Sequence, residues 1–324
     1  MASLDALRKK IDNGIEQLDF NRSPIELYEP ISYTLGLGGK RLRPALCLLA
    51  CDLVEGDIEK ALPPAIGIEI FHNFTLLHDD IMDKALIRRG KETVHVKWNP
   101  NAAILSGDTM MALAYEFIMQ APDHVRSRVF TVFNRTAIEV CEGQQHDMNF
   151  ENALNVGIPD YMEMIRLKTA VLLAGSLKIG AIIGGSDDGI ADALYRFGES
   201  MGIAFQLKDD LLDVFSDEEK FGKTKGGDIV TNKKTYLYLK AFEIAKGGTL
   251  SELQRLFSDS YISPDEKVEG VKKIYEQLKI RSHTEDQITR YYSEAMTALE
   301  KIDLPESRKS ELIQFARQLK QRDS

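Results

Sequence analysis

The strongest constraint on the fold is a helical repeat of apolar residues that runs through most of the chain. Apolar residues recur every three or four positions, whereas alternating patterns flanked by hairpin turns are hard to find. The ten prolines fall where helical periods begin or break, as expected for residues that punctuate helices. The sequence therefore predicts an all-α fold.

The predicted helices cover residues 3–19, 24–36, 42–54, 63–86, 100–120, 125–150, 159–184, 187–217, 230–246, 250–258, 265–281, 284–301 and 305–321. Connections between them are short, and no low-complexity linker divides the 324 residues. Some predicted helices are longer than the usual globular helix. We expect one domain over residues 1–324, a single large helical bundle around a deep central cavity.

Charge and composition exclude several classes of protein. A formal net charge of -9 argues against nucleic-acid binding, which needs a surplus of Lys and Arg on one face. No run of 18 uncharged apolar residues predicts a membrane span, and the first residues lack the apolar core of a signal peptide. The three cysteines lack the spacing of a zinc site or disulfide framework, and Cys47 and Cys51 are expected in the core. We expect a cytoplasmic protein.

Two acidic motifs of the form Asp-Asp-x-x-Asp are embedded in apolar helical segments, "LLHDDIMD" at 76–83 and "QLKDDLLD" at 206–213. Asp79 and Asp83 are four residues apart, as are Asp209 and Asp213, so each pair shares a helical face. Like charges at such spacing repel unless they are compensated. Mg²⁺, which takes oxygen ligands and also binds phosphate oxygens, would compensate them. A solvated acidic patch is the alternative for one motif, but the repetition favours a metal site.

Short basic clusters accompany the acidic motifs. They are "GLGGKRLRP" at 36–44, "RRG" at 88–90 and "KFGKTKGGDIVTNKKT" at 220–235. Glycines allow the backbone to approach a ligand, and Arg and Lys bind phosphate. Neither the dinucleotide-binding fingerprint nor the Walker loop is complete. Carboxylates for Mg²⁺ beside cations for phosphate together predict a site for a diphosphate and its metals.

Seven elements occur in an order that resembles the trans-isoprenyl diphosphate synthases of the polyprenyl synthetase family. They are "GGKRLRP" at 38–44, "HDDIMD" at 78–83, "RRG" at 88–90, "GQQHD" at 143–147, "KT" at 168–169, "FQLKDDLLD" at 205–213, and "GK" followed by "GGDIVTNKKT". The resemblance covers about residues 36 to 240. The flanking segments carry no motif that we could assign.

The resemblance implies head-to-tail condensation of isopentenyl diphosphate with an allylic diphosphate, which ionises first. It implies three Mg²⁺ ions, with Asp79, Asp83 and Asp209 as ligands and Asp80, Asp210 and Asp213 in support. It places Arg88, Lys168, Lys223 and Lys233 on the allylic diphosphate, and Lys40, Arg43, His72 and Arg89 on isopentenyl diphosphate. Thr169 and Gln206 would lie near the cation, and the departed diphosphate would accept the final proton. Arg88 and Arg89 thus serve different substrates, and a homodimer is implied.

Phe74 is expected to set the product length. It precedes Asp79 by five residues, about 7.5 Å along a helix, where a large ring closes the floor of a cavity. An aromatic residue there, with an uninserted first motif, resembles enzymes that make short products. Thr75 departs from the doubly aromatic pattern of eukaryotic farnesyl synthases. We therefore expect geranylgeranyl diphosphate first and farnesyl diphosphate next.

Other functions remain open at this point. A di-iron helical bundle is one, because "EIFH" at 69–72 and "ETVH" at 92–95 fit Glu-x-x-His, although the second copy lacks a long helix. A catalytically silent partner subunit of a prenyl synthase is another, but it would not need both acidic motifs. A cyclising prenyl synthase is disfavoured by the second set of diphosphate-binding residues. For His72, a core position is the alternative to a substrate contact.

Overall fold

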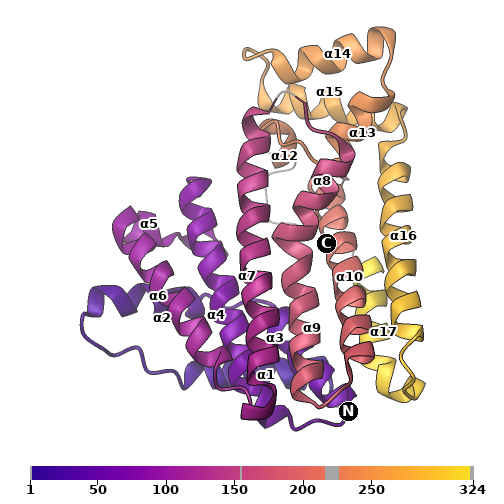
Figure 1. The fold of residues 1–324 in the computed structure, drawn as a ribbon. Helices are drawn as coiled ribbons and strands as arrows, with labels where there is room; N and C mark the ends of the chain where they lie inside the picture. The colour runs from indigo at the N-terminus through magenta and orange to yellow at the C-terminus, as the bar shows by residue number, and fades with distance from the viewer. Residues whose placement is uncertain (1, 154, 216–225, 322–324) are drawn as a thin grey trace. The chain divides into compact units, whose positions relative to one another are not determined.

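The computed structural model describes residues 2–153, 155–215 and 226–321, and almost all of this chain is helical (Figure 1). The helices are α1 (Leu4–Glu16), α2 (Ile25–Gly36), α3 (Leu42–Leu53), α4 (Ile58–Met82), α5 (Val94–Lys97), α6 (Pro100–Ile118), α7 (Asp123–Asn152), α8 (Ile158–Ile165), the π-helix η1 (Arg166–Ala170), α9 (Val171–Ile183), α10 (Asp188–Phe215), α12 (Gly227–Val230), α13 (Tyr236–Ile244), α14 (Gly247–Ser258), α15 (Pro264–Gln277), α16 (Ile280–Glu300) and α17 (Glu306–Gln321). The all-α prediction is confirmed. In the described helices none is long and apolar enough to cross a membrane.

The prediction that every proline marks a helix boundary is wrong for Pro30, Pro63 and Pro64, which lie inside α2 and α4. Helix α4 begins at Ile58 because the side chain of Asp57 accepts a hydrogen bond from the backbone N–H of Glu59, 3.0 Å away. Pro63 and Pro64 therefore fall in the second turn, near an exposed end. There the carbonyls that lose a partner belong to Glu59 and Lys60, which are both exposed residues.

A short antiparallel pair of strands was not expected from the sequence. Strands β1 (Ile87–Arg88) and β2 (Lys91–Glu92) are joined by Arg89 and Gly90, whose φ values are 52° and 74°. Two central residues with positive φ are typical of the tight type I′ hairpin. This hairpin follows the first acidic motif directly.

The chain folds into two compact units. The first unit contains residues 1–135 and 175–195, and helix α3 lies in its core, with the residues from Leu46 to Cys51 fully buried. A Cβ on Gly180 of α9 would lie 1.9 Å from the carbonyl oxygen of Cys47, so the two helix backbones pack closely. The expectation that Cys47 and Cys51 are core residues is confirmed.

The second unit contains residues 136–174 and 196–324. Its core joins α8, α10 and the helices from α13 to α16, with Tyr161, Leu207, Leu237 and Tyr275 among the buried side chains. A Cβ on Gly202 of α10 would lie 2.5 Å from the Cα of Ala170, so α10 packs directly on η1. This packing positions the segment that carries the predicted residues Lys168 and Thr169.

Candidate active site

The first acidic motif lies at the C-terminal end of α4. Asp80 is buried, Asp79 is partly buried, and Asp83 is the exposed residue that caps the helix. Arg88 of β1 donates from Nε to both carboxylate oxygens of Asp80, at 2.8 Å each, and its Nη2 lies 2.7 Å from Oδ1. The same Nη2 is 3.7 Å from Asp79 Oδ2. The hairpin thus places the guanidinium of Arg88 beside the carboxylates of the acidic motif that precedes it in the sequence.

Burial raises the pKa of Asp80, although the hydrogen bonds and charge of Arg88 oppose the rise. Burial lowers the pKa of Arg88, but the hydrogen bonds to Asp80 and the negative charges of Asp80, Asp79 and Asp83 together raise the pKa overall. Arg88 therefore provides the compensation that a half-buried acidic cluster requires. The sequence prediction assigned Arg88 to binding of the allylic diphosphate. In this structure its guanidinium is bound to Asp80.

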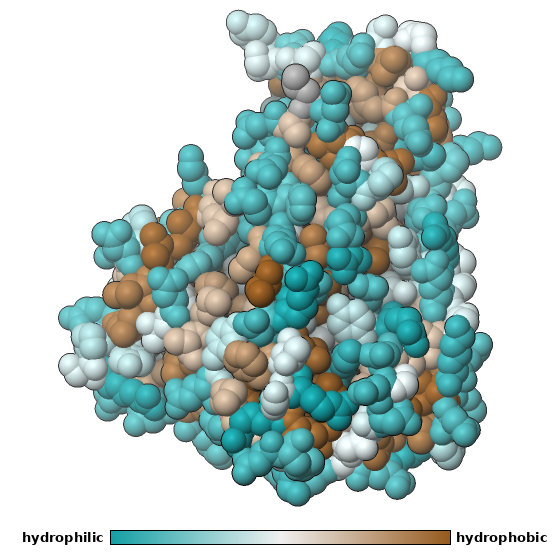
Figure 2. Space-filling model, in the orientation of Figure 1, coloured by the Kyte–Doolittle hydropathy of each residue, from teal (hydrophilic) through white to brown (hydrophobic). Residues whose placement is uncertain are grey.

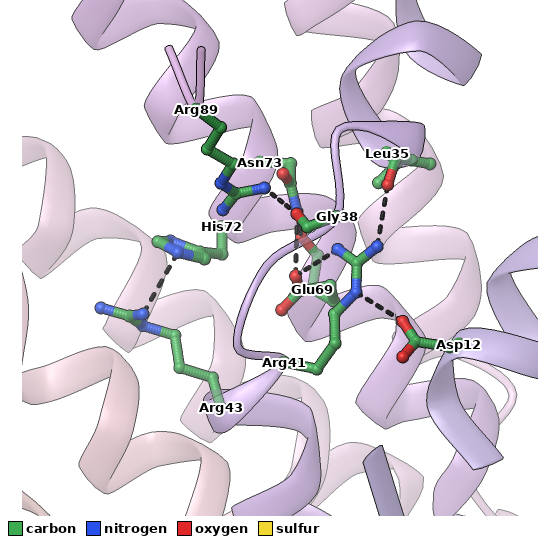
Figure 3. A network of polar contacts seen from close by, with 9 residues as sticks. All are labelled: Asp12, Leu35, Gly38, Arg41, Arg43, Glu69, His72, Asn73 and Arg89. Atoms are coloured by element: carbon green, nitrogen blue, oxygen red, sulfur yellow. Dashed lines mark hydrogen bonds and ion pairs between the residues drawn. The ribbon is translucent and has the colours of Figure 1, made fainter. Parts of the chain in front are cut away.

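Arg89 lies at the tip of the hairpin and contacts a different segment. Its Nη1 donates to the carbonyl oxygen of Gly38 in the basic loop between α2 and α3 (Figure 3). A Cβ added to Gly39 would meet the guanidinium of Arg89 at 2.9 to 3.1 Å, and Gly39 has a φ of 148°. The backbone conformation at 39 therefore favours glycine, and the lack of a side chain there leaves room for the guanidinium of Arg89.

Arg43 and His72 form the other contact of the basic loop with α4. Arg43 Nη1 lies 3.2 Å from His72 Nε2 (Figure 3). Because a guanidinium only donates, Nε2 of His72 accepts and the proton of the neutral imidazole is on Nδ1. Burial, followed by the charge of Arg43, holds the pKa of His72 well below 6.5. Lys40 of the same loop is exposed.

The second acidic motif lies near the C-terminal end of α10. Asp210 is buried, whereas Asp209 and Asp213 are partly exposed. The hydroxyl of Tyr161 donates to Asp210 Oδ2, and Gln206 Nε2 donates to Oδ1 at 3.1 Å. Burial, reinforced by the charge of Asp228, raises the pKa of Asp210 to about 7. Tyr161 was not anticipated, because it belongs to no motif and its ring is a core residue.

Asp213 also supports the segment after α10. Its Oδ2 accepts a hydrogen bond from the backbone N–H of Asp228 at 3.1 Å, and its carbonyl oxygen accepts from Gly226 at 3.0 Å. Gly226 has a φ of 68° and precedes α12. Lys233 follows α12, and its backbone N–H donates to the Asp228 carbonyl at 2.8 Å. The acidic motif and the segment that carries Lys233 are therefore joined locally.

Lys267 of α15 also contacts the segment that carries Lys233. This lysine is 8% exposed, and its Nζ lies 2.5 Å from Asn232 Oδ1 and 3.3 Å from the carbonyl oxygen of Val230. A Cβ on Gly226 would meet the side chain of Val268 at 2.8 Å. The C-terminal part of the chain, which carries no recognisable motif, thus fixes the segment that bears Lys233.

Lys168 and Thr169 lie in the π-helix η1, where the backbone widens by one residue. Lys168 Nζ is 2.6 Å from Asp147 Oδ2 of α7, and Thr169 Oγ1 donates to Gln206 Oε1 at 3.1 Å. A Cβ on Gly143 would lie 2.2 Å from the backbone nitrogen of Lys168. The residues Gly143 and Asp147 of "GQQHD" therefore position Lys168, a role that the sequence prediction left unassigned.

Phe74 lies on α4 with 7% of its surface exposed. Its ring centroid is 5.5 Å from that of Phe71 and 4.7 Å from that of His78. The neighbouring Thr75 donates from its hydroxyl to the carbonyl oxygen of His72 at 2.8 Å, so its polar group is satisfied within α4. Of the predicted residues, Lys223 lies outside the residues that the structure describes.

Each unit therefore brings together part of the predicted set. The first unit collects Asp79, Asp80, Arg88 and Arg89, the last three of which line one small pocket, and it pairs Arg43 with His72. The second unit joins Asp210 to Thr169 through Gln206 and connects Asp213 to the segment of Lys233. Within each unit, several of the predicted residues are therefore linked by hydrogen bonds.

The donor chemistry fits magnesium. Each motif offers only carboxylate oxygens, and in each the central aspartate is fixed by hydrogen bonds, as is usual for groups that support ligating carboxylates. No group of three or more His, Cys, Asp or Glu in the described ranges is already arranged to hold a metal. The di-iron alternative is not supported, because Glu69 is bound to Arg41 and His72 to Arg43.

An all-helical chain with two such acidic motifs and separate cationic clusters is typical of isoprenoid synthases. The polyprenyl synthetase family matches residues 24–278. The chain is 39% identical to a geranylgeranyl pyrophosphate synthase of Geoglobus acetivorans over 97% of both chains. It is 42% identical to a geranylgeranyl diphosphate synthase of Methanosarcina mazei over 75% of this chain and 76% of the relative. A crystal structure of a geranylgeranyl pyrophosphate synthase superposes with a TM-score of 0.94 at 44% identity, covering 100% of both chains.

This chain belongs to the polyprenyl synthetase family. The resemblance stated from the seven motifs is confirmed.

Proposed function

We propose that this protein is a prenyltransferase that condenses isopentenyl diphosphate with an allylic diphosphate to give a short-chain all-trans prenyl diphosphate. The observation that carries the proposal is the pair of acidic motifs, each with its central carboxylate anchored by a dedicated donor, Arg88 for Asp80 and Tyr161 for Asp210. A silent partner subunit would have no need for either anchor. Two full-length or near full-length relatives carry names of geranylgeranyl diphosphate synthases, which favours that product.

We assign Asp79, Asp83 and Asp209 as ligands of Mg²⁺, with Asp80, Asp210 and Asp213 supporting them. When bound, magnesium would supply positive charge to a diphosphate as it leaves, and about three ions are expected from the family. Only oxygen donors are offered at these positions, which suits a hard cation.

The chain's own cations act on the two diphosphates. Lys168, Lys233 and Arg88, with Lys223, are assigned to the allylic diphosphate, where fixed positive charge stabilises the negative charge that develops on the leaving group. Release of Arg88 from Asp80 would accompany this role, because metal then compensates the carboxylates. Lys40, Arg43, Arg89 and His72 are assigned to isopentenyl diphosphate.

Neutral His72 fits a binding role better than an acid role. Its Nε2 accepts from Arg43, which orients the guanidinium, and Nδ1–H is the remaining donor. Thr169 and Gln206 place an oxygen-rich pair beside Asp210, suited to an allylic cation. Apolar helices around these groups exclude water that would quench the cation. The final proton is assigned to the departed diphosphate.

The partner is proposed to be a second copy of this chain. Large apolar side chains are exposed on α6, with Ile104 at 45% and Leu105 at 59%. Figure 2 shows apolar surface on the left of the view, over the part of the first unit where Figure 1 places α5 and α6. Burial of such a face against its own copy fits a homodimer. A cytoplasmic location and a single domain over residues 1–324 stay predictions from the sequence.

The test uses purified protein with magnesium, isopentenyl diphosphate and each allylic diphosphate primer in turn, with products sized by chromatography. We expect condensation with at least one primer and geranylgeranyl diphosphate as the main product. Asp79→Asn and Asp209→Asn, each assayed alone, should abolish turnover while the helical circular dichroism is kept. An absence of condensation with every primer would refute the proposed function.

A further inference from the structure

Arg41 is a buried arginine in the middle of the basic loop that no motif assigns to a substrate. It lies between Lys40 and Arg43, directly before α3, with φ 43° and ψ 35° in the left-handed region. Non-glycine residues rarely adopt this conformation. Its side chain is only 4% exposed, unlike the exposed Lys40. A strained backbone position with a buried charge must be stabilised by strong local interactions.

Three different segments accept hydrogen bonds from the Arg41 side chain (Figure 3). Arg41 Nε donates to Asp12 Oδ1 of α1 at 2.9 Å, and Nη1 donates to Glu69 Oε1 of α4 at 2.8 Å. Nη2 donates to the carbonyl oxygen of Leu35 in α2, also at 2.8 Å. A planar guanidinium satisfied on three sides fixes the direction of the backbone that carries it. The loop is therefore tied to α1, α2 and α4 through one side chain.

Glu69 is the central countercharge of the cluster. It is 2% exposed, and its Oε1 also accepts from Asn73 Nδ2 at 3.1 Å, while the same Nδ2 donates to the Glu69 carbonyl at 2.8 Å. Burial lowers the pKa of both Arg43 and Arg89, and the negative charge of Glu69 opposes this for each. One carboxylate, held by Asn73, thus favours the charged form of three arginines.

We propose that Arg41, held by Glu69 and Asp12, is a positioning residue that fixes Lys40 and Arg43 in the arrangement that binds the diphosphate of isopentenyl diphosphate. The inference deepens the proposed function and rests on it. It also gives α1 a role: this helix lies outside residues 24–278, which match the family, and it reaches the loop through Asp12.

The consequence is specific to one substrate. Each of the three nitrogens of Arg41 donates to a protein group, and the side chain is only 4% exposed, so we assign it no contact with substrate. If its hold is weakened, Lys40 and Arg43 sample more conformations, and binding must order them again. The affinity for isopentenyl diphosphate then falls. Of the residues assigned to the allylic diphosphate, Lys168 and Lys233 lie in the second unit, and Arg88 is held by Asp80 and makes no hydrogen bond to Arg41 or Glu69, so the KM for the allylic primer should be unaffected.

Three variants test this: Asp12→Asn, Glu69→Gln and Arg41→Lys. For Asp12→Asn we expect the KM for isopentenyl diphosphate to rise about threefold to tenfold, the loss of one charge-assisted hydrogen bond. For Glu69→Gln and Arg41→Lys we expect a rise of at least about tenfold, because a buried partner is removed. The KM for the allylic primer and kcat should change by less than about twofold.

Asp5→Asn is the matched control. Asp5 lies on the same helix and pairs with Arg8 at 3.1 Å, but its side chain is 84% exposed. It should leave both KM values unchanged, since an exposed pair of this kind contributes little. Asp12 is 48% exposed, so Asp12→Asn should fold even where Glu69→Gln does not. Thermal unfolding without substrate separates a loss of stability from a loss of binding.

Calorimetric binding of isopentenyl diphosphate alone is measured for the wild type and for Asp12→Asn. A wild type that binds but gives no product refutes the proposed function, while weaker binding by Asp12→Asn still supports the positioning role. An active wild type with Asp12→Asn indistinguishable from Asp5→Asn overturns the inference. Equal rises in both KM values, or a fall in kcat alone, overturn it as well.

Discussion

Replacing Phe74 by alanine should lengthen the product. The ring is 7% exposed, and it packs against Phe71 and His78 with centroids 5.5 and 4.7 Å away. Phe74 precedes Asp79 by five residues on α4, which places it about 7.5 Å farther down the helix from the proposed metal ligand. A prenyl chain that grows away from the diphosphate along this helix would meet the ring.

Removing the ring has two separable effects. The lost burial and the space left behind should lower the free energy of unfolding by about 3–5 kcal/mol. The same space is available to the growing chain, so product should shift from geranylgeranyl diphosphate to longer prenyl diphosphates. Both effects follow from one substitution, but only the longer product depends on where the ring lies.

Phe315→Ala is the matched control for this prediction. Phe315 is 5% exposed on α17, far along the sequence from any proposed ligand, and its loss should lower stability by a similar amount without changing the product. Products of both variants are sized by chromatography after reaction with isopentenyl diphosphate in excess, and unfolding is followed in urea. If Phe74→Ala loses stability but keeps the wild-type product, the ring does not close the cavity floor.

Other predictions concern the anchors of the site. Tyr161→Phe removes the hydroxyl that holds Asp210, so half-saturation of activity and of direct binding should need about 10- to 100-fold more Mg²⁺; an unchanged metal titration would contradict the anchoring role. EDTA should abolish turnover, and excess Mg²⁺ should restore it without a change in the far-ultraviolet circular dichroism. The pKa of His72 is lowered in the folded state, so below about pH 6.5 the unfolded chain takes up a proton that the folded chain does not. The contribution of His72 to stability should therefore fall as pH drops from about 6.5, by at most about 1.4 kcal/mol per pH unit. Protonation of Asp210, whose pKa is raised to about 7, acts in the opposite direction, so the His72 contribution is measured as the difference between wild type and His72→Gln in denaturation from about pH 7 to about pH 5. Lys267→Met leaves the oxygens of Asn232 and Val230 without this donor, which should cost about 1–3 kcal/mol and weaken binding of the allylic primer; unaltered primer affinity would separate this loop from the substrate.

The helices were predictable because apolar periodicity is a local signal. The predicted range 187–217 and the observed α10 (Asp188–Phe215) nearly coincide. The start of α4 was missed because Pro63 and Pro64 were taken as its boundary, while the cap at Asp57 leaves only a single-residue signal. The β1–β2 hairpin has two-residue strands, too short to show any alternation.

The site was predictable as a set of motifs but not as a set of contacts. Asp80 and Arg88 were both chosen from the sequence, yet their pairing depends on a turn with positive φ at Arg89. Glu69 was considered only as part of a Glu-x-x-His pattern, because its partner Arg41 is 28 residues away and meets it through the packing of α3 on α4. Tyr161 reaches Asp210 across 49 positions of sequence.

The π-helix that carries Lys168 and Thr169 has a consequence for how this chain tolerates deletions. A π-turn is equivalent to a regular helix with one residue inserted, and the wide turn absorbs the extra residue, so the helix that follows keeps nearly the rotational phase of an uninterrupted helix. Removing one residue from 166–170 would therefore restore a uniform α-helix and leave Val171 and Ala174 of α9, which are fully buried, in the core. The side chains of the wide turn itself would take new directions. We therefore expect a chain shortened by one residue here to fold, but to lose the contacts of Lys168 with Asp147 and of Thr169 with Gln206.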